Sequence, residues 1–376
     1  MDFIPEGVLN SQQLRKLTTH GVIRCGSSGL EAKGSAFDLH LSSQGWRLEG
    51  SIKQIAGLGE TVEAVCTKFG SAFALTTKGT LLKRGSVAVI RLQEEIDFSQ
   101  HPWLVGEATG KSSIGRLDIL TRLLVNGWPE YECVPAGHAG PLYVEVAPIS
   151  FDVVIYPGTS LNQLRIHCGP RMLLTSLVGR RLLFRSDREF CAGAQENKTL
   201  SLNISSQGSE TSGLAAYVLR RGKLPPLDLK LKGKIDASEY FEAVRSMDDS
   251  LTLKVNRFYI LRSVERLALP DDIAVTGMAY SESLGELRIH YAGFAHPWFG
   301  MQREDRRKGT PLIFEVRAHS FPIILRHNEV FAKILFYKMA TKIPAKDKEP
   351  EARDYTNQEL KVSNYFAKGS EPQLSG

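Results

Sequence analysis

The stretch GKSSIGRLDILTRL, residues 110–123, carries residue types that bind phosphate. A helix that begins at Ser112 leaves backbone N–H groups unpaired beside Lys111 and Ser113, and such groups attract anions. The same helix places Ser112 and Arg116 four residues apart on one face. An N-cap serine followed by a surface arginine would give the same letters without any chemistry. The rest of the chain therefore has to favour one interpretation.

A second candidate is Glu145 in LYVEV, residues 142–146, where apolar and polar side chains alternate as they do on a strand. The alternation places Glu145 and Tyr143 on the face opposite the three aliphatic residues. A carboxylate there can accept a proton from water, although a lone glutamate on a strand is usually only solvated. Glu145 needs partners before it indicates catalysis.

Composition places these residues in an ordinary globular chain of 376 residues, with 42% hydrophobic and 23% charged residues and room for about two domains. The net charge of +6 suits an anionic ligand, but basic residues neighbour acids, as in RLQEEID and MQREDRRKG. No basic stripe interleaved with aromatics predicts a nucleic-acid partner. No apolar run reaches the length of about 20 residues that a membrane span needs, and we expect a cytoplasmic protein.

The cysteines argue against a zinc site. There are five, widely and irregularly spaced and without a CxxC pair, so we expect reduced and mostly buried thiols. A zinc nucleobase deaminase requires H-x-E followed by P-C-x-x-C. The only H-x-E, His327 to Glu329, follows the last cysteine. We therefore predict no zinc.

The chain repeats itself. GKSSIGRLDI (110–119) aligns with YSESLGELRI (280–289), and PLYVEVAPISF (141–151) aligns with PLIFEVRAHSF (311–321), both at an offset of 170. Two separate matches at one offset indicate two copies of one fold. We place a first domain at 1–215, a second at 216–345 and a tail at 346–376.

Each copy is predicted to be mainly β. Short alternating runs end at Gly/Pro turns, which is typical of a distorted β-barrel or jelly-roll sandwich. Helices are expected only at 10–19, 112–122 and 236–246. The tail begins with a charged, proline-containing linker and regains aromatic residues in YTNQELKVSNYF, so it either packs on its own domain or closes over a ligand as a lid.

These residues resemble the dCTP deaminase family, and more closely its long tandem form found in some bacteria. The resemblance rests on the SSxxR and GxLxxE pair and on GVLNSQQLRKLTTHGVI, SAFDLHLSSQGWRL, YPGTSLNQLRI and YTNQELKVSNYF. It implies two dUTPase-like domains with few short helices, and a homo-oligomer with a trimer favoured. The implied reaction is hydrolysis of dCTP to dUTP and ammonia without a catalytic metal, which feeds dTTP synthesis. Mg²⁺ is implied only as an ion bound through the triphosphate.

The resemblance also implies roles for individual residues. It places the catalytic glutamate at Glu145, and the serine and arginine around the water at Ser112 and Arg116. The nucleotide and phosphate contacts that it implies are Lys111, Ser113, Asp38, Gln163, Tyr355, Gln358 and Ser363. Lysine at 111 replaces an arginine common in the short deaminases and loses its bidentate fork.

The second copy departs from this pattern. At the offset of 170, Ser112 becomes Glu282 and Arg116 becomes Glu286, and both carboxylates would repel a triphosphate. We therefore predict that the second copy is a structural half. Its Glu315, the counterpart of Glu145, is interpreted as a relic of the fold position.

Two other functions remain open. A bifunctional deaminase and dUTPase would give dUMP, but its water-activating aspartate belongs in the hairpin that reads ECVPAGHAG (132–140), where only Glu132 offers a carboxylate. A catalytically silent nucleotide-binding protein on the same fold is the other alternative.

Overall fold

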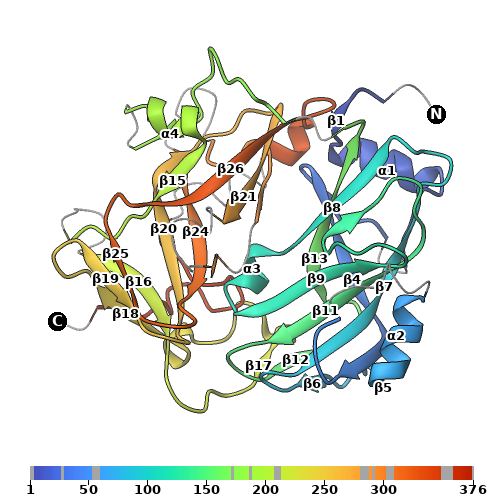
Figure 1. Cartoon of the computed structure of the whole chain (residues 1–376), viewed down its shortest axis with the longest axis horizontal. Coiled ribbons are helices and arrows are strands. Elements are labelled where there is room, and N and C mark those ends of the chain that lie inside the picture. The colour runs from blue at the N-terminus through green and yellow to red at the C-terminus, as the bar shows by residue number, and fades with distance from the viewer. Residues whose placement is uncertain are drawn as a thin grey trace.

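The alternating runs form strands over most of the chain, and the fold is mainly β with few short helices, which confirms the predicted fold class (Figure 1). The computed structural model describes residues 4–26, 29–52, 60–170, 173–185, 189–206, 213–279, 288–289, 293–301, 309–348 and 359–374. Figure 1 shows two β-rich halves side by side, with α3 (Ser112–Gly115) between them. We call the boundary between the halves the seam.

The first half is one nearly closed, barrel-like sheet with a small sheet beside it. The main path runs β10-β8-β13-β4-β7-β11-β9, and β1, β2, β3 and β5 pair along it. The bounds are β1 (Gly7–Val8), β2 (Ile23–Arg24), β3 (Ala32–Lys33), β4 (Ala36–Leu48), β5 (Gly70–Ala74), β6 (Thr80–Leu82), β7 (Val87–Asp97), β8 (Leu104–Gly110), β9 (Ile119–Val125), β10 (Cys133–Val134), β11 (Ala139–Pro148), β12 (Val153–Ile155) and β13 (Ser160–Cys168).

The second half contains three sheets. Their orders are β18-β16-β20-β24-β22 with β14 on β20, then β15-β26-β21-β23, and the pair β19-β25. The bounds are β14 (Leu183–Phe184), β15 (Thr199–Ser201), β16 (Leu214–Leu219), β17 (Leu227–Asp228), β18 (Phe241–Arg245), β19 (Ser250–Leu253), β20 (Phe258–Leu267), β21 (Ile273–Ala279), β22 (Arg288–Ile289), β23 (Phe294–Ala295), β24 (Thr310–Arg317), β25 (Ile323–Arg326) and β26 (Val330–Lys338).

The strand pairings repeat in the order that the alignment predicts. β11 pairs with β7 as β24 pairs with β20, and β12 pairs with β6 as β25 pairs with β19. β13 and β26 begin 170 residues apart and end 170 residues apart. The chain therefore holds two copies of one fold.

The boundary between the copies lies earlier than residue 215. β14 pairs with β20, β15 with β26, and β16 with β18, so the segment 183–219 belongs to the second copy. No repeat match marks this segment in the sequence, which is why the predicted first domain runs too far. The later junction is also not a free linker, because β17 pairs in parallel with β12 of the first copy.

The helices agree with the predictions in part. The structure has α1 (Ser11–Thr19), α2 (Val62–Phe69), α3 (Ser112–Gly115) and α4 (Ala192–Asn197), with 3₁₀ turns η1 (Leu229–Leu231) and η2 (Ala237–Glu239). Asn10 caps α1 in a capping box with Gln13. The helix expected at 112–122 stops after one turn, and the one expected at 236–246 is η2 followed by β18. Neither α2 nor α4 was predicted.

The described end of the tail is part of the core. Leu360, Val362, Tyr365 and Phe366 are buried in one cluster with apolar residues of both copies. The Phe366 ring lies 5.3 Å from that of Tyr240. The described end of the tail therefore packs on the body of the chain, and closure over a ligand stays a prediction. In the described ranges, no helix is long and apolar enough to cross a membrane.

We expect Phe366→Ala to lower the free energy of unfolding by about 3 to 5 kcal/mol, because it removes a buried ring and leaves a cavity. Phe321→Ala is the control, since Phe321 is 54% exposed and its loss should change stability by less than about 0.5 kcal/mol. Chemical denaturation measures both. Equal stability of the Phe366 variant and the wild type would show that the tail is not structural.

Candidate active site

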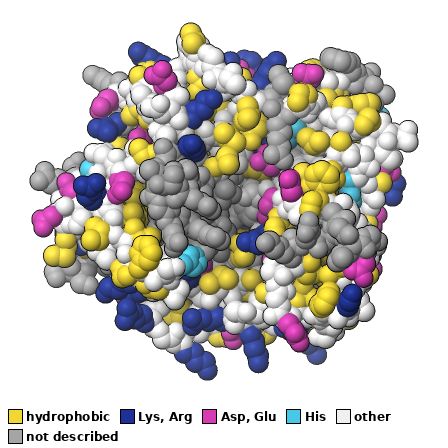
Figure 2. All heavy atoms as spheres, in the orientation of Figure 1, with side chains coloured by type: hydrophobic (Ala, Val, Ile, Leu, Met, Phe, Trp, Pro, Cys, Tyr) yellow, Lys and Arg dark blue, Asp and Glu magenta, His cyan; other side chains and the backbone are white. Residues whose placement is uncertain are grey.

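A basic pocket of about 640 Å³ lies at the seam, a volume within the range of small-molecule sites. Six Lys or Arg side chains and two carboxylates are among the described residues that line it. The lining residues are Glu31, Ala32, Lys33, Ala36, Asp38, Lys111, Ser112, Ser113, Arg116, Gln163, Lys232, Phe294, His296, Lys361, Val362, Asn364 and Lys368. Figure 2 shows acidic and basic side chains on the described part of one face, with Lys and Arg gathered along its lower edge.

The helix α3 brings three of the predicted residues to the pocket. Ile114 and Leu117 are fully buried and anchor this short segment. Lys111 stands at the N-cap, and Ser112 begins the helix as the sequence predicts. Asp118, with φ of 55°, then turns the chain into β9. Ser112, Ser113 and Arg116 consequently face the cavity.

The predicted phosphate contacts of the first copy lie together. The Lys111 ammonium donates to a carboxylate oxygen of Asp38. Gln163 on β13 is directly opposite Asp38 on β4, and both line the pocket. Pairing of these two strands therefore brings residues more than a hundred positions apart to one wall.

The tail forms another wall. The Ser363 hydroxyl donates to the Ser113 carbonyl over 2.6 Å, and Ser363 is 1% exposed. Ser363 therefore holds the tail on α3, while its neighbours Lys361 and Asn364 line the cavity. Two other predicted contacts, Tyr355 and Gln358, lie outside the described residues.

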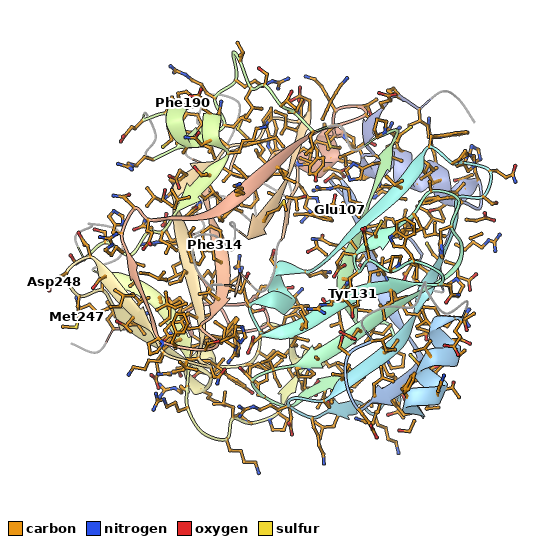
Figure 3. All side chains as sticks on the ribbon, viewed as in Figure 1. Glu107, Tyr131, Phe190, Met247, Asp248 and Phe314 are labelled. Atoms are coloured by element: carbon orange, nitrogen blue, oxygen red, sulfur yellow. The ribbon has the colours of Figure 1, made fainter. Side chains whose placement is uncertain are left out.

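Glu145 does not join this group. The side chain of Glu145 is buried on β11 and is not among the described lining residues. The Ser51 hydroxyl lies within hydrogen-bond distance of both carboxylate oxygens, at 2.9 and 2.8 Å, and the Ile52 N–H donates over 3.2 Å. Tyr131, labelled in Figure 3, lies 3.1 Å from the Ser51 hydroxyl. Within the described part of this chain, the contacts of the Glu145 carboxylate do not reach Ser112 or Arg116, so the grouping of the three residues stays a prediction.

Glu315, like Glu145, is not a described lining residue, but it reaches the pocket through Arg116. The Arg116 Nε lies 3.6 Å from a carboxylate oxygen of Glu315, across the seam. Glu315 is 3% exposed, and burial raises its pKa to about 8 despite the opposing effect of Arg116. Glu315 opposite Ile260 occupies the register that Glu145 opposite Val89 occupies in the first copy. Comparison within one copy could not reveal this pairing.

A second ion pair crosses the seam with its charges reversed. Arg317, two residues after Glu315, donates to the carboxylate of Asp118, two residues after Arg116. The Ser150 hydroxyl donates to the same carboxylate, and Arg317 donates to Ser150 over 3.0 Å. In Figure 3, Phe314 on β24 and Glu107 on β8 mark the two sides of this seam.

The second copy contributes further residues that sequence reasoning missed. Phe294 and His296 line the pocket. Gly293 comes so close to α3 that an added Cβ would lie 3.2 Å from the Ser112 hydroxyl. The sequence GFAH, residues 293–296, could have indicated these residues, but it lies in the copy that was predicted to be inactive. Glu282 and Glu286, on which that prediction depended, lie outside the described residues.

Glu132, the carboxylate considered for dUTP hydrolysis, is not a described lining residue. Burial raises its pKa to about 8. No cluster of three or more His, Cys, Asp or Glu side chains within the described ranges is placed to hold a metal ion.

Comparisons with known proteins agree on one family. Residues 5–170 match the family model of the 2′-deoxycytidine 5′-triphosphate deaminase N-terminal domain, and residues 178–366 match that of its C-terminal domain. The crystal structure of 2′-deoxycytidine 5′-triphosphate deaminase from Agrobacterium tumefaciens is similar, with a TM-score of 0.81 and 27% identity over 92% of this chain and 99% of that one. A search of curated protein sequences gives no match.

We expect Arg317→Met to lower the free energy of unfolding by about 3 to 5 kcal/mol, because the buried Asp118 carboxylate loses its cation. Adding Asp118→Asn should recover much of that loss, since the amide is neutral and tolerates the positive φ. Chemical denaturation of the single and double variants gives the coupling energy.

The control for this cycle is Arg180→Met. Arg180 forms a two-hydrogen-bond pair with Asp272 at the surface, and its loss should cost less than about 1 kcal/mol. Strictly additive losses in the Asp118 and Arg317 variants would mean that the buried pair does not couple the copies.

Proposed function

The chain belongs to the 2′-deoxycytidine 5′-triphosphate deaminase family, and on that premise we propose that it hydrolyses dCTP to dUTP and ammonia in the pocket at the seam. The observation that carries the proposal is the approach of Arg116 from the first copy to Glu315 from the second, 3.6 Å apart. It joins a basic cavity suited to a polyphosphate to a carboxylate suited to proton transfer. One site is thus built from both halves.

We assign the role of general base to Glu315 rather than to Glu145. A general base works best when its pKa is near the working pH, and burial raises the pKa of Glu315 to about 8. Arg116, which lines the cavity, stands next to it. The carboxylate oxygens of Glu145 instead lie against the chain's own Ser51 and Ile52.

The proposed reaction balances without an oxidant or reductant. Water adds its oxygen to C4 of cytosine, while Glu315 takes one water proton and delivers it to N3. Glu315 then moves the proton of the new hydroxyl to the amino group. The C4–N bond breaks, ammonia leaves and a carbonyl forms at C4, which gives the uracil ring.

Ser112 and Arg116 support these steps. We propose that the Ser112 hydroxyl orients the water and that the Arg116 guanidinium stabilises the oxygen of the tetrahedral adduct, since donors aimed at developing charge lower a barrier. Arg116 also favours the ionised form of Glu315. Both residues are held by α3, whose apolar side chains are buried.

The phosphates would lie among the basic side chains. Lys111 and Gln163 line the pocket on the same wall as Asp38, and this grouping supports the phosphate contacts that the resemblance implies. Oxygen ligands and phosphates are what Mg²⁺ takes, and the carboxylates of Asp38 and Glu31 fit that donor set. These two would hold the ion, which when bound would neutralise phosphate charge.

The product distinguishes the alternatives. Incubation of the purified protein with dCTP and Mg²⁺, followed by separation of dCTP, dUTP and dUMP, should give dUTP and ammonia. Accumulation of dUMP would indicate the bifunctional enzyme, and unchanged dCTP would indicate a silent binding protein. The trimer and the cytoplasmic location stay predictions.

We expect Glu315→Gln to lower kcat for dCTP by about 100- to 10,000-fold, because the amide keeps the side-chain size but cannot accept the water's proton. Glu145→Gln is the matched control at the equivalent position, and it should keep most of kcat. Steady-state kinetics with ammonia detection measures both. The opposite ranking in folded variants would return the role to Glu145 and refute the site at the seam.

The pH dependence follows from the raised pKa of Glu315. The base works only when ionised, so kcat/KM should rise about tenfold per pH unit below the pKa and level off above pH 8. Arg116→Lys keeps a positive charge, so kcat/KM should still rise over the same pH range. Arg116→Met removes that charge and should move the rise to higher pH. A flat profile between pH 6 and pH 9 would contradict the assignment.

A further inference from the structure

His296 of the second copy is a buried polar residue at the wall of the pocket. It follows β23, which pairs with β21 through Phe294 opposite Thr276. His296 is 9% exposed and lines the cavity. The proposed mechanism gives it no role.

The hydrogen bonds of the ring fix its tautomer. The backbone N–H of Ser35 donates to His296 Nδ1 over 3.4 Å, and the Ser35 hydroxyl lies 3.0 Å from the same nitrogen. A backbone N–H can only donate, so Nδ1 is an acceptor and the neutral ring carries its proton on Nε2. Gly34 packs against the Nδ1 edge of the ring. The Nε2 edge is left for the pocket, and no hydrogen bond to Nε2 occurs among the described residues.

Burial, followed by the charge of a buried arginine, favours the neutral form of the ring by lowering its pKa. Arg165 on β13 is fully buried, and its guanidinium carbon lies 3.8 Å from the centre of the Phe294 ring. It donates to the Thr276 hydroxyl over 3.1 Å. In the part of the chain that the structure describes, no carboxylate lies within 4 Å of it.

Burial and the positive charges of Arg165, Lys33 and Lys111 lower the pKa of His296 to about 3. These are the charged groups that act on the ring from β13, from β3 and from the start of α3. His296 therefore stays neutral throughout the pH range in which an enzyme of this kind works.

Resting on the proposed function, we propose that His296 is a nucleotide-binding residue whose Nε2–H donates a hydrogen bond to an oxygen of the bound nucleotide, on the phosphate chain or on the sugar. A neutral imidazole donates a hydrogen bond with a defined direction, whereas the surrounding lysines attract the nucleotide through their charge. Arg165 and Ser35 are positioning residues of the first copy, because Arg165 contacts β21, on which β23 pairs, and Ser35 contacts the ring.

Two variants separate the two edges of the ring. In His296→Asn, the amide oxygen can still accept from Ser35, but the side chain is too short to place a donor where Nε2 stands. In His296→Gln, the longer side chain can place an N–H there. We expect the Kd for dCTP, measured by calorimetry, to rise about 5- to 30-fold in the Asn variant and to recover mostly in the Gln variant.

Kinetic readouts distinguish binding from a structural role. In His296→Asn, KM should rise with Kd while kcat stays within about twofold, because lost uniform binding leaves kcat unchanged. The pH limb of kcat/KM should keep its wild-type position. His138→Asn is the control, since His138 is buried to 8% exposure, has its pKa lowered by burial and is not a described lining residue.

Inorganic tripolyphosphate identifies the acceptor. Weaker tripolyphosphate binding by His296→Asn places the acceptor on the phosphate chain, whereas a defect confined to dCTP places it on the sugar. Equal Kd for dCTP in the wild type and His296→Asn would overturn the inference. Binding of dCTP without turnover would refute the proposed function alone, and a wild type that does not bind dCTP would overturn both.

Discussion

The approach of Arg116 to Glu315 is the constraint on which the pocket depends. Each side chain comes from a different copy, and both are largely buried. Removing a charge from water costs several kcal/mol, so such a pair persists only when the two elements that carry it are held in register. The ion pair between Arg317 and Asp118 lies beside it and helps to hold the same elements in register. In this pair the second copy carries the cation and the first copy the anion. The two copies can consequently dock through these strands and α3 in one arrangement.

The two equivalent glutamates show that neighbours, rather than strand position, decide what a carboxylate does. Glu145 and Glu315 share a register on matching strands. The first is covered by Ser51 and Ile52 of its own copy, whereas the second has the Arg116 guanidinium beside it. Two glutamates at equivalent positions therefore have different partners among the described residues.

Much of this architecture could be predicted from the sequence, because repeat spacing and alternation are local signals. The matching strands followed from them, and the helix start at Ser112 followed from its capping pattern. The grouping of Lys111, Asp38 and Gln163 at one pocket was implied by the family resemblance. The partner of Arg116 could not be predicted in this way. Aligning the two copies pairs equivalent positions, such as Glu145 and Glu315, whereas Arg116 and Glu315 occupy different positions in the two copies. The packed tail was left open because its aromatic residues suit a core and a lid equally well.

The parallel pairing of β17 with β12 ties the second copy back onto the first. Because the two half-sites belong to one chain, their association is intramolecular, at an effective concentration on the order of millimolar. Dilution that would separate half-sites on different chains leaves this one assembled. Each copy can therefore lose the site residues that the other copy supplies, provided that the other copy keeps them.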